Sequence, residues 1–196
     1  LISIENVIGT SQNDIIKGTS SVIVANTLEG GAGNDTLTGL AGNDTLDGGS
    51  DDDMLDGGEG DDLLIGGSGS DTITYASTIG NVEVNIGSSV QGGLNANETT
   101  GDGTDLLSSI ENVIGSNGDD TIYGNTSINT ISGGSGDDSL YGMDNNDTLK
   151  GNGGSDYLDG GNGNDSLNGG SGNDIFKSSN ALSRLPEWKN IIPLIK

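Results

Sequence analysis

Apolar residues recur at every ninth position over two stretches of the chain, residues 30–74 and 133–177. Each stretch divides into five units of nine residues, the first two units being GGAGNDTLT and GLAGNDTLD. Position eight of each unit is apolar and stands between mostly polar neighbours: Leu37, Leu46, Leu55, Leu64, Ile73, Leu140, Leu149, Leu158, Leu167 and Phe176. Because successive strand residues point to opposite faces, the pattern predicts a short strand at positions seven to nine with position eight facing inward. The Gly-rich positions one to six predict a turn.

Position six is Asp in all ten units: Asp35, Asp44, Asp53, Asp62, Asp71, Asp138, Asp147, Asp156, Asp165 and Asp174. The same register extends upstream of each stretch, to Asp14 and to Asp120, and each of these units is followed by one with Asn at position six, Asn26 or Asn129. The heptapeptide SIENVIG also occurs twice, at residues 3–9 and 109–115. The chain therefore consists of two copies of one design, joined by a segment of another kind.

Composition changes this picture, because 196 residues with 30% hydrophobic and 3% aromatic content make a poor core. Globular domains are roughly 45–50% apolar, and a chain this polar is expected to stay disordered unless something else supplies stability. The net charge of −24 excludes nucleic acid and anionic membrane surfaces as partners, and no apolar run is long enough to span a bilayer. The absence of Cys and His excludes disulfides, thiolate and imidazole metal sites, and histidine catalysis.

The units resemble the nonapeptide G-G-x-G-x-D-x-U-x of RTX, or haemolysin-type calcium-binding, proteins, over nearly all of residues 1–177. The resemblance implies an all-β fold, a right-handed parallel β-roll in two tandem blocks, with two nonapeptides in each coil and Ca²⁺ at both edges. It stacks Asp35, Asp53 and Asp71 on one edge and Asp44 and Asp62 on the other. In the second block the stacks are Asp120, Asp138, Asp156 and Asp174, then Asp147 and Asp165. The implied metal-site residues are these acidic residues with Asp14, and the glycines Gly30, Gly33, Gly48, Gly57, Gly60, Gly66, Gly133, Gly136, Gly151, Gly160, Gly163 and Gly169.

The chemistry of the turns agrees with calcium. Backbone carbonyls and carboxylates are hard oxygen ligands, which suit Ca²⁺. Carboxylates stacked about 4.8 Å apart repel one another unless a cation lies between them, so folding is expected to be coupled to metal binding. The turns with Asp51 at position four, or with Met143 and Asn145 in place of Gly, are expected to bind weakly. Whether the units of Asp14, Asn26, Asp120 and Asn129 hold metal is left open.

Four regions are predicted: a first block at residues 1–74, a segment at 75–106, a second block at 107–177 and a flank at 178–196. The middle segment carries a strand pattern in Val82, Val84 and Ile86, and no nonapeptide is recognised in it. It is interpreted as a crossover that caps the roll, with a linker as the alternative; Asp102 and Asp105 add a calcium site or lie in a solvated loop. The flank contains Trp188 and the apolar run 191–195, which predict a cap; a type I secretion signal and membrane contact are alternatives.

The predicted function is a calcium-binding module of a secreted bacterial protein, which folds on meeting extracellular Ca²⁺ and supports type I secretion and stability. No catalytic centre is predicted, because the acidic residues recur in every turn without a pocket-forming aromatic beside them. The alternatives are a non-catalytic module of a secreted alginate epimerase, protease or lipase, and an adhesin or S-layer segment. The predicted partners are calcium ions and a polysaccharide or cell-surface target, with the module a monomeric part of a larger protein.

Overall fold

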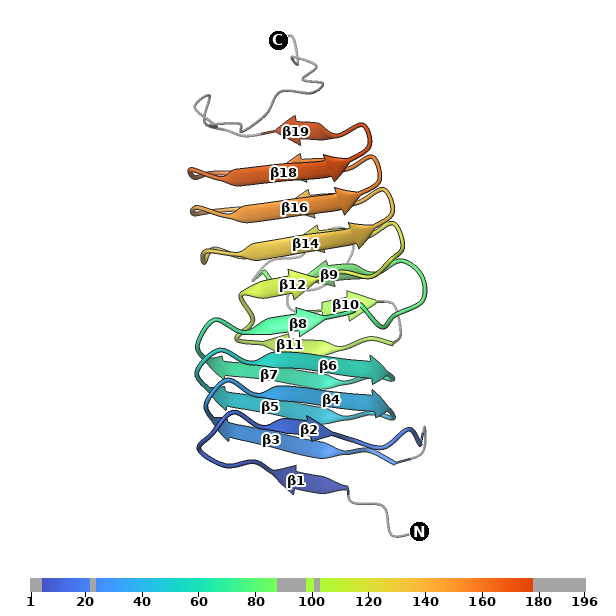
Figure 1. Ribbon diagram of the computed structural model, residues 1–196, viewed down its shortest axis with the longest axis vertical. Coiled ribbons are helices and arrows are strands. Elements are labelled where there is room, and N and C mark those ends of the chain that lie inside the picture. Colours follow the sequence, from blue (N-terminus) through green and yellow to red (C-terminus); the bar gives the residue numbers. More distant parts are fainter. Residues whose placement is uncertain (1–4, 22–23, 88–97, 101–102, 178–196) are drawn as a thin grey trace.

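The computed structural model describes residues 5–21, 24–87, 98–100 and 103–177, which form two facing sheets stacked along one long axis (Figure 1). The larger sheet has eleven strands in the order β1 (Asn6–Ile8), β3 (Thr27–Ala32), β5 (Thr45–Ser50), β7 (Leu63–Ser68), β11 (Leu106–Ser108), β10 (Glu98–Thr100), β9 (Glu83–Asn85), β13 (Thr121–Tyr123), β15 (Ser139–Tyr141), β17 (Tyr157–Asp159) and β19 (Ile175–Lys177). The second sheet has eight strands in the order β18 (Ser166–Ser171), β16 (Thr148–Gly153), β14 (Thr130–Ser135), β12 (Asn112–Ile114), β8 (Thr72–Thr74), β6 (Met54–Glu59), β4 (Thr36–Ala41) and β2 (Ile15–Lys17).

All strand pairs except those of β10 are parallel, and the chain alternates between the two sheets within each block. In the larger sheet Leu28 lies opposite Leu46, and Leu46 lies opposite Leu64. Each step is therefore eighteen residues, two nonapeptides to a coil, as the resemblance implies. The predicted all-β parallel roll is confirmed. No helix long and apolar enough to cross a bilayer occurs among the described residues.

The core is a column of single apolar side chains from position eight, and its predicted inward direction is confirmed. Nine of the ten such residues are buried, and seven of the nine have no exposed surface. Phe176, in the final strand, is only partly buried against the column. Val84, Leu107 and Val113 continue the column between the blocks, so it is unbroken from Ile16 to Leu167.

The Gly-rich turns are less loop-like than the sequence predicts, because several strands run on into positions one to three of the next unit. Strand β4, for example, continues from Thr36 through Ala41. Positions two and four have positive φ in all ten units, from 74° at Asn152 to 155° at Gly69. Glycine adopts such angles without steric cost, which explains its frequency there.

The middle segment contributes strands to the larger sheet, and this differs from the predicted cap. Strand β9 pairs in parallel with β13 of the second block, and β11 pairs in parallel with β7 of the first. Strand β10 lies between β9 and β11 and is antiparallel to both. Exposed strand edges favour pairing, so the segment fills the gap between the blocks instead of covering an end. Residues 88–97, 101–102 and the predicted flank lie outside the described residues, and the four region boundaries stay a prediction.

A nonapeptide that the sequence analysis missed lies in this segment, at residues 100–108. Gly103 has positive φ at position four, Asp105 is at position six, and buried Leu107 is at position eight. Glu111 occupies position six of the next unit, because β12 follows it directly. Thr100 in place of the first Gly, and Glu in place of Asp, hid these two units from the repeat pattern.

Candidate metal sites

The turns form two rows, one along each edge of the roll. Row one leads into the eight-stranded sheet, and its position-six residues are Asp14, Asp35, Asp53, Asp71, Glu111, Asn129, Asp147 and Asp165. Row two leads into the eleven-stranded sheet. Its position-six residues are Glu5, Asn26, Asp44, Asp62 and Asp105, then, beyond β10, Val82, Asp120, Asp138, Asp156 and Asp174. The structure thus places each predicted stack of aspartates within one row.

Within a row, one carboxylate oxygen of each aspartate is fixed by the coil before it. The backbone amide of Asp35 donates to Oδ1 of Asp53 at 2.8 Å, and the amide of Asp138 donates to Oδ1 of Asp156 at 2.9 Å. The same bond joins Asp71 to the Glu111 carboxylate at 3.0 Å, so row one continues across the join between the blocks. Each of these side chains is therefore held in one direction by the backbone of the neighbouring coil.

Position five forms a second ladder of opposite direction, which the sequence analysis did not identify. Oδ1 of Asp119 accepts the backbone amide of Asp137 at 2.8 Å, and Oδ1 of Asp137 accepts that of Ser155 at 2.6 Å. Here the side chain belongs to the earlier coil and the amide to the later one. The sequence signal is that position five is Asn, Asp or Ser in all ten units.

The second carboxylate oxygen is buried without a hydrogen-bond partner in nine turns: Asp35, Asp44, Asp53, Asp62, Asp71, Asp138, Asp147, Asp156 and Asp165. A buried carboxylate oxygen without a partner is costly, so each of these atoms calls for a cation or a donor. In a tenth turn, Asp174 in the last coil is more exposed than the buried aspartates.

The position-one glycine makes room for this oxygen. A Cβ on Gly30 would collide with Oδ2 of Asp35 and come within 2.6 Å of the carbonyl oxygen of Gly48 in the next coil. Two oxygens from two coils thus converge on one point. Eight predicted site residues lie in the same way against Oδ2 of the position-six aspartate of their own turn: Gly30, Gly48, Gly57, Gly66, Gly133, Gly151, Gly160 and Gly169. The other four, Gly33, Gly60, Gly136 and Gly163, supply the positive φ of position four.

The electrostatics favour a cation at these turns. Burial raises the pKa of Asp62 and of Asp138 to about 7, and neighbouring carboxylates add to the effect. Burial and the same kind of repulsion raise the pKa of Asp53 and of Asp147 to about 6. Burial also raises the pKa of Asp44, Asp71, Asp120 and Asp156, against the opposing effect of a backbone hydrogen bond. The ionised row is therefore unfavourable on its own and gains from a positive ion.

The donor set fits calcium. In the described part of the chain no three acidic side chains come together as a metal-binding group. An ion at one of these turns would take one carboxylate and complete its shell with backbone carbonyls, and Ca²⁺ accepts six to eight such oxygens in flexible geometry. The ion would supply charge neutralisation between coils and a link from one turn to the next.

Comparison with known protein families agrees with this geometry. The model of the RTX calcium-binding nonapeptide repeat matches residues 25–55, 47–76, 114–149 and 141–176, which cover more than half of the chain. The chain belongs to this family. The RTX repeat binds Ca²⁺ at multiple sites, so calcium is the cofactor of this chain. A search of curated proteins finds no match.

Four nonapeptide turns within the blocks of the RTX chain differ from their neighbours, because a backbone amide of the same turn already donates to the inner oxygen of the position-six side chain. The backbone amides of Thr10 and Ser116 donate to Oδ2 of Asp14 at 2.6 Å and of Asp120 at 2.7 Å. The corresponding bonds to the two asparagines run from Thr19 to Asn26 at 2.7 Å and from Asn125 to Asn129 at 2.8 Å. These are the four turns whose metal binding the sequence left open.

The turns expected to bind weakly have the same backbone as their neighbours. Asp51, Met143 and Asn145 have φ of 77°, 81° and 79°. Leu40 has φ of 86° at position two of a further unit. Positive φ strains the backbone of a residue that carries a Cβ, so replacing Gly at these positions costs conformational energy. The turn itself keeps the same backbone conformation as its neighbours.

Proposed function

We propose that this RTX chain is a folding module that is ordered by calcium. The observation that carries the proposal is the set of nine buried Oδ2 atoms without a hydrogen-bond partner. In five of these turns, those of Asp35, Asp44, Asp71, Asp147 and Asp156, a carbonyl oxygen of the next coil lies close to the same point. Without ions the folded chain holds rows of carboxylates whose charge is disfavoured by burial. With ions the same rows link each coil to the next, so binding energy becomes folding energy.

The wider role follows from where calcium is abundant. RTX repeats are typical of secreted proteins, and the proposal places this module outside a bacterial cell after type I secretion. In a cytoplasm poor in Ca²⁺ the chain stays unfolded and can pass through a narrow exporter; outside, it folds. Within the larger secreted protein it acts as a monomeric module without a catalytic centre, and a polysaccharide or cell-surface target is the partner of the whole protein.

Circular dichroism during a Ca²⁺ titration of the chelated chain tests the proposal. We expect a disordered spectrum in chelator and a cooperative change to β-structure as Ca²⁺ rises, reversed by adding chelator again. NaCl at equal ionic strength is the control, since screening alone weakens repulsion between carboxylates without bridging them. A β-spectrum that is the same in chelator and in Ca²⁺ would overturn the proposal, and so would a full response to NaCl.

A further inference from the structure

The nonapeptide turns of the two blocks fall into two classes, which differ at position two. In ten turns, here called open, position two has positive φ and its residue is Gly, Leu40, Met143 or Asn152. In four turns, here called closed, position two is Thr10, Thr19, Ser116 or Asn125, and φ is not positive. The closed turns are those of Asp14, Asn26, Asp120 and Asn129, two at the start of the first block and two at the start of the second.

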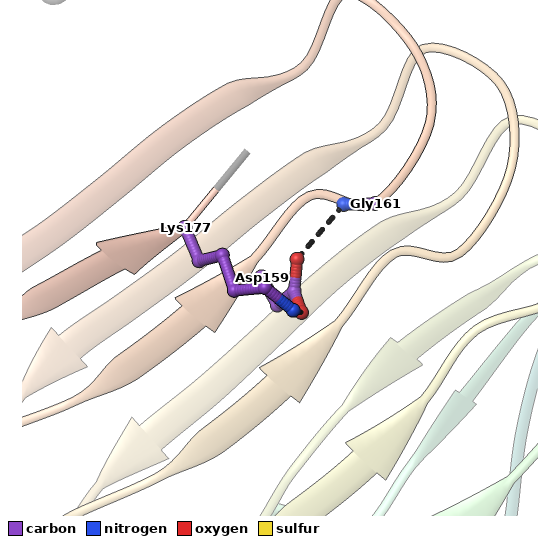
Figure 2. Close-up of polar contacts among 3 residues, drawn as sticks. All are labelled: Asp159, Gly161 and Lys177. Atoms are coloured by element: carbon purple, nitrogen blue, oxygen red, sulfur yellow. Dashed lines mark hydrogen bonds and ion pairs between the residues drawn. The ribbon is translucent and has the colours of Figure 1, made fainter. Parts of the chain in front are cut away.

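The position-two amide points in different directions in the two classes. In the closed turns it points inward, and in the turn of Asp120 the N–H of Ser116 donates to the inner carboxylate oxygen at 2.7 Å. In the open turn of Asp165 the N–H of Gly161 instead donates to Oδ1 of Asp159, on the outer face of the sheet, at 3.2 Å (Figure 2). The inner Oδ2 of Asp165 then has no hydrogen-bond partner.

The rest of the cradle is the same in both classes. A Cβ on Gly115, in the closed turn of Asp120, would collide with Oδ2 of Asp120 and with the carbonyl oxygen of Gly133 in the next coil. These are the counterparts of the two oxygens that meet at Gly30 in an open turn. Asp120 is also as fully buried as the aspartates of the open turns. The direction of one peptide N–H therefore separates the classes.

We propose that the backbone at position two decides which turns take calcium, and that the four closed turns remain metal-free. An inward N–H uses the lone pair that an ion would need and presents a positive partial charge to it. Thr and Ser favour this state because their Cβ disfavours positive φ, whereas Gly adopts positive φ freely. Each block then begins with one coil whose two turns are held by hydrogen bonds and continues with turns that need ions.

Native mass spectrometry of the full chain in Ca²⁺, which counts bound ions, tests this with Ser116→Gly. We expect one more ion than in the unaltered chain, because the turn can now open around a buried carboxylate. Ser116→Ala is the matched control: it removes the hydroxyl bonds to Gly80 and Asp120 but keeps the Cβ, so the ion count stays the same. Thr10→Gly, in the corresponding turn of the first block, repeats the gain at Asp14 if the Ser116 variant fails to fold.

The inference is overturned if both glycine variants bind the same number of ions as the unaltered chain, or if the alanine control gains an ion too. The inference rests on the proposed function, calcium binding by the open turns, but different results would contradict each of them. If the unaltered chain binds no calcium and keeps its β-spectrum in chelator, the proposed function fails. If the unaltered chain binds and folds but the glycine variants gain nothing, only the role of position two fails.

Discussion

The two RTX blocks and the junction between them, residues 75–114, have one fold but pair their buried carboxylates differently. In the blocks, Asp53 and its counterparts have one oxygen bonded to a backbone amide and the other without a partner. In the junction, Asp105 accepts the Asp62 amide on Oδ1 and the Tyr75 hydroxyl on Oδ2, both at 3.0 Å. Strands β9 and β11 of the junction continue the parallel pairing of the blocks, and only β10 between them is antiparallel.

The difference teaches that the roll requires a partner for each buried oxygen and does not require that the partner be an ion. At Asp105 a tyrosine hydroxyl serves, and at Val82 the carboxylate is replaced altogether by an apolar side chain that is 2% exposed. Under the proposed function, the blocks leave the same role to calcium. The proposal therefore predicts that the stability of the blocks depends on the Ca²⁺ concentration, whereas that of the junction does not.

The largest expected effect is common to both regions. Leu140→Ala in a block and Leu107→Ala in the junction each remove a buried side chain from the same column. Each substitution is expected to cost about 2–5 kcal/mol through lost burial and a cavity. Thermal or denaturant unfolding in saturating Ca²⁺ measures this. A cost confined to the block would show that the junction does not share the core, and would break the comparison.

The next effect separates the regions. Asp138→Asn removes the charge of an unpartnered ligand, and we expect it to lose one ion. That loss costs about 2.7 kcal/mol when free Ca²⁺ is about a hundred times the dissociation constant of the site. Asp137→Asn makes the same charge change at an exposed neighbour that keeps its Oδ1 acceptor, and should cost less than about 0.5 kcal/mol. Equal costs for the two variants would mean that net charge alone is at work.

Tyr75→Phe tests the junction. It removes one hydrogen bond to a buried carboxylate, which is worth about 1.5–3 kcal/mol. The cost should be the same at two Ca²⁺ concentrations above the folding midpoint, while that of Asp138→Asn should grow with Ca²⁺. Tyr141→Phe is the control, because it removes a hydroxyl from the outer face of the roll. The ring centroid of Tyr141 lies 4.7 Å from that of Tyr123, on which it stacks. A Tyr75 cost that rises with Ca²⁺ would contradict a metal-independent junction.

The smallest effect is expected at the ion pair between Lys177 and Asp159, which lies outside both rows (Figure 2). The lysine side chain is 58% exposed, so solvent screens the pair. Lys177→Ala should cost about 0.2–1 kcal/mol in chemical unfolding. A cost as large as that of Asp138→Asn would show that this exposed pair, and not the rows alone, holds the last coil in place.

The sequence predicts the core column and the aspartate rows because both follow from one period. An apolar residue and an Asp at fixed places in each nonapeptide are enough to determine inward direction and stacking. The period also explains why the nonapeptide of Asp105 in the junction was not predicted. Asp62 meets Asp105 across 43 residues instead of eighteen, so the repeat gives no indication that they belong to one row.

Whether a turn is open or closed could not be predicted from residue types either. Asn is found at position two both in an open turn, at Asn152, and in a closed one, at Asn125. Their difference lies in a backbone angle, which local and neighbouring contacts decide together. The hydrogen-bond ladder at position five could not be predicted for a simpler reason. Its Asn, Asp and Ser residues look like ordinary turn residues until the coils are stacked and their oxygens meet the next amide.

The path of the chain through the junction has a mechanical consequence. Strand β9 comes first in the sequence but sits beside the second block, and β11 comes later but sits beside the first. The backbone therefore crosses between the two blocks three times, whereas a simple linker would cross once. Tension applied along the axis is shared among the hydrogen bonds of β9, β10 and β11, so the blocks should yield to pulling as a single body.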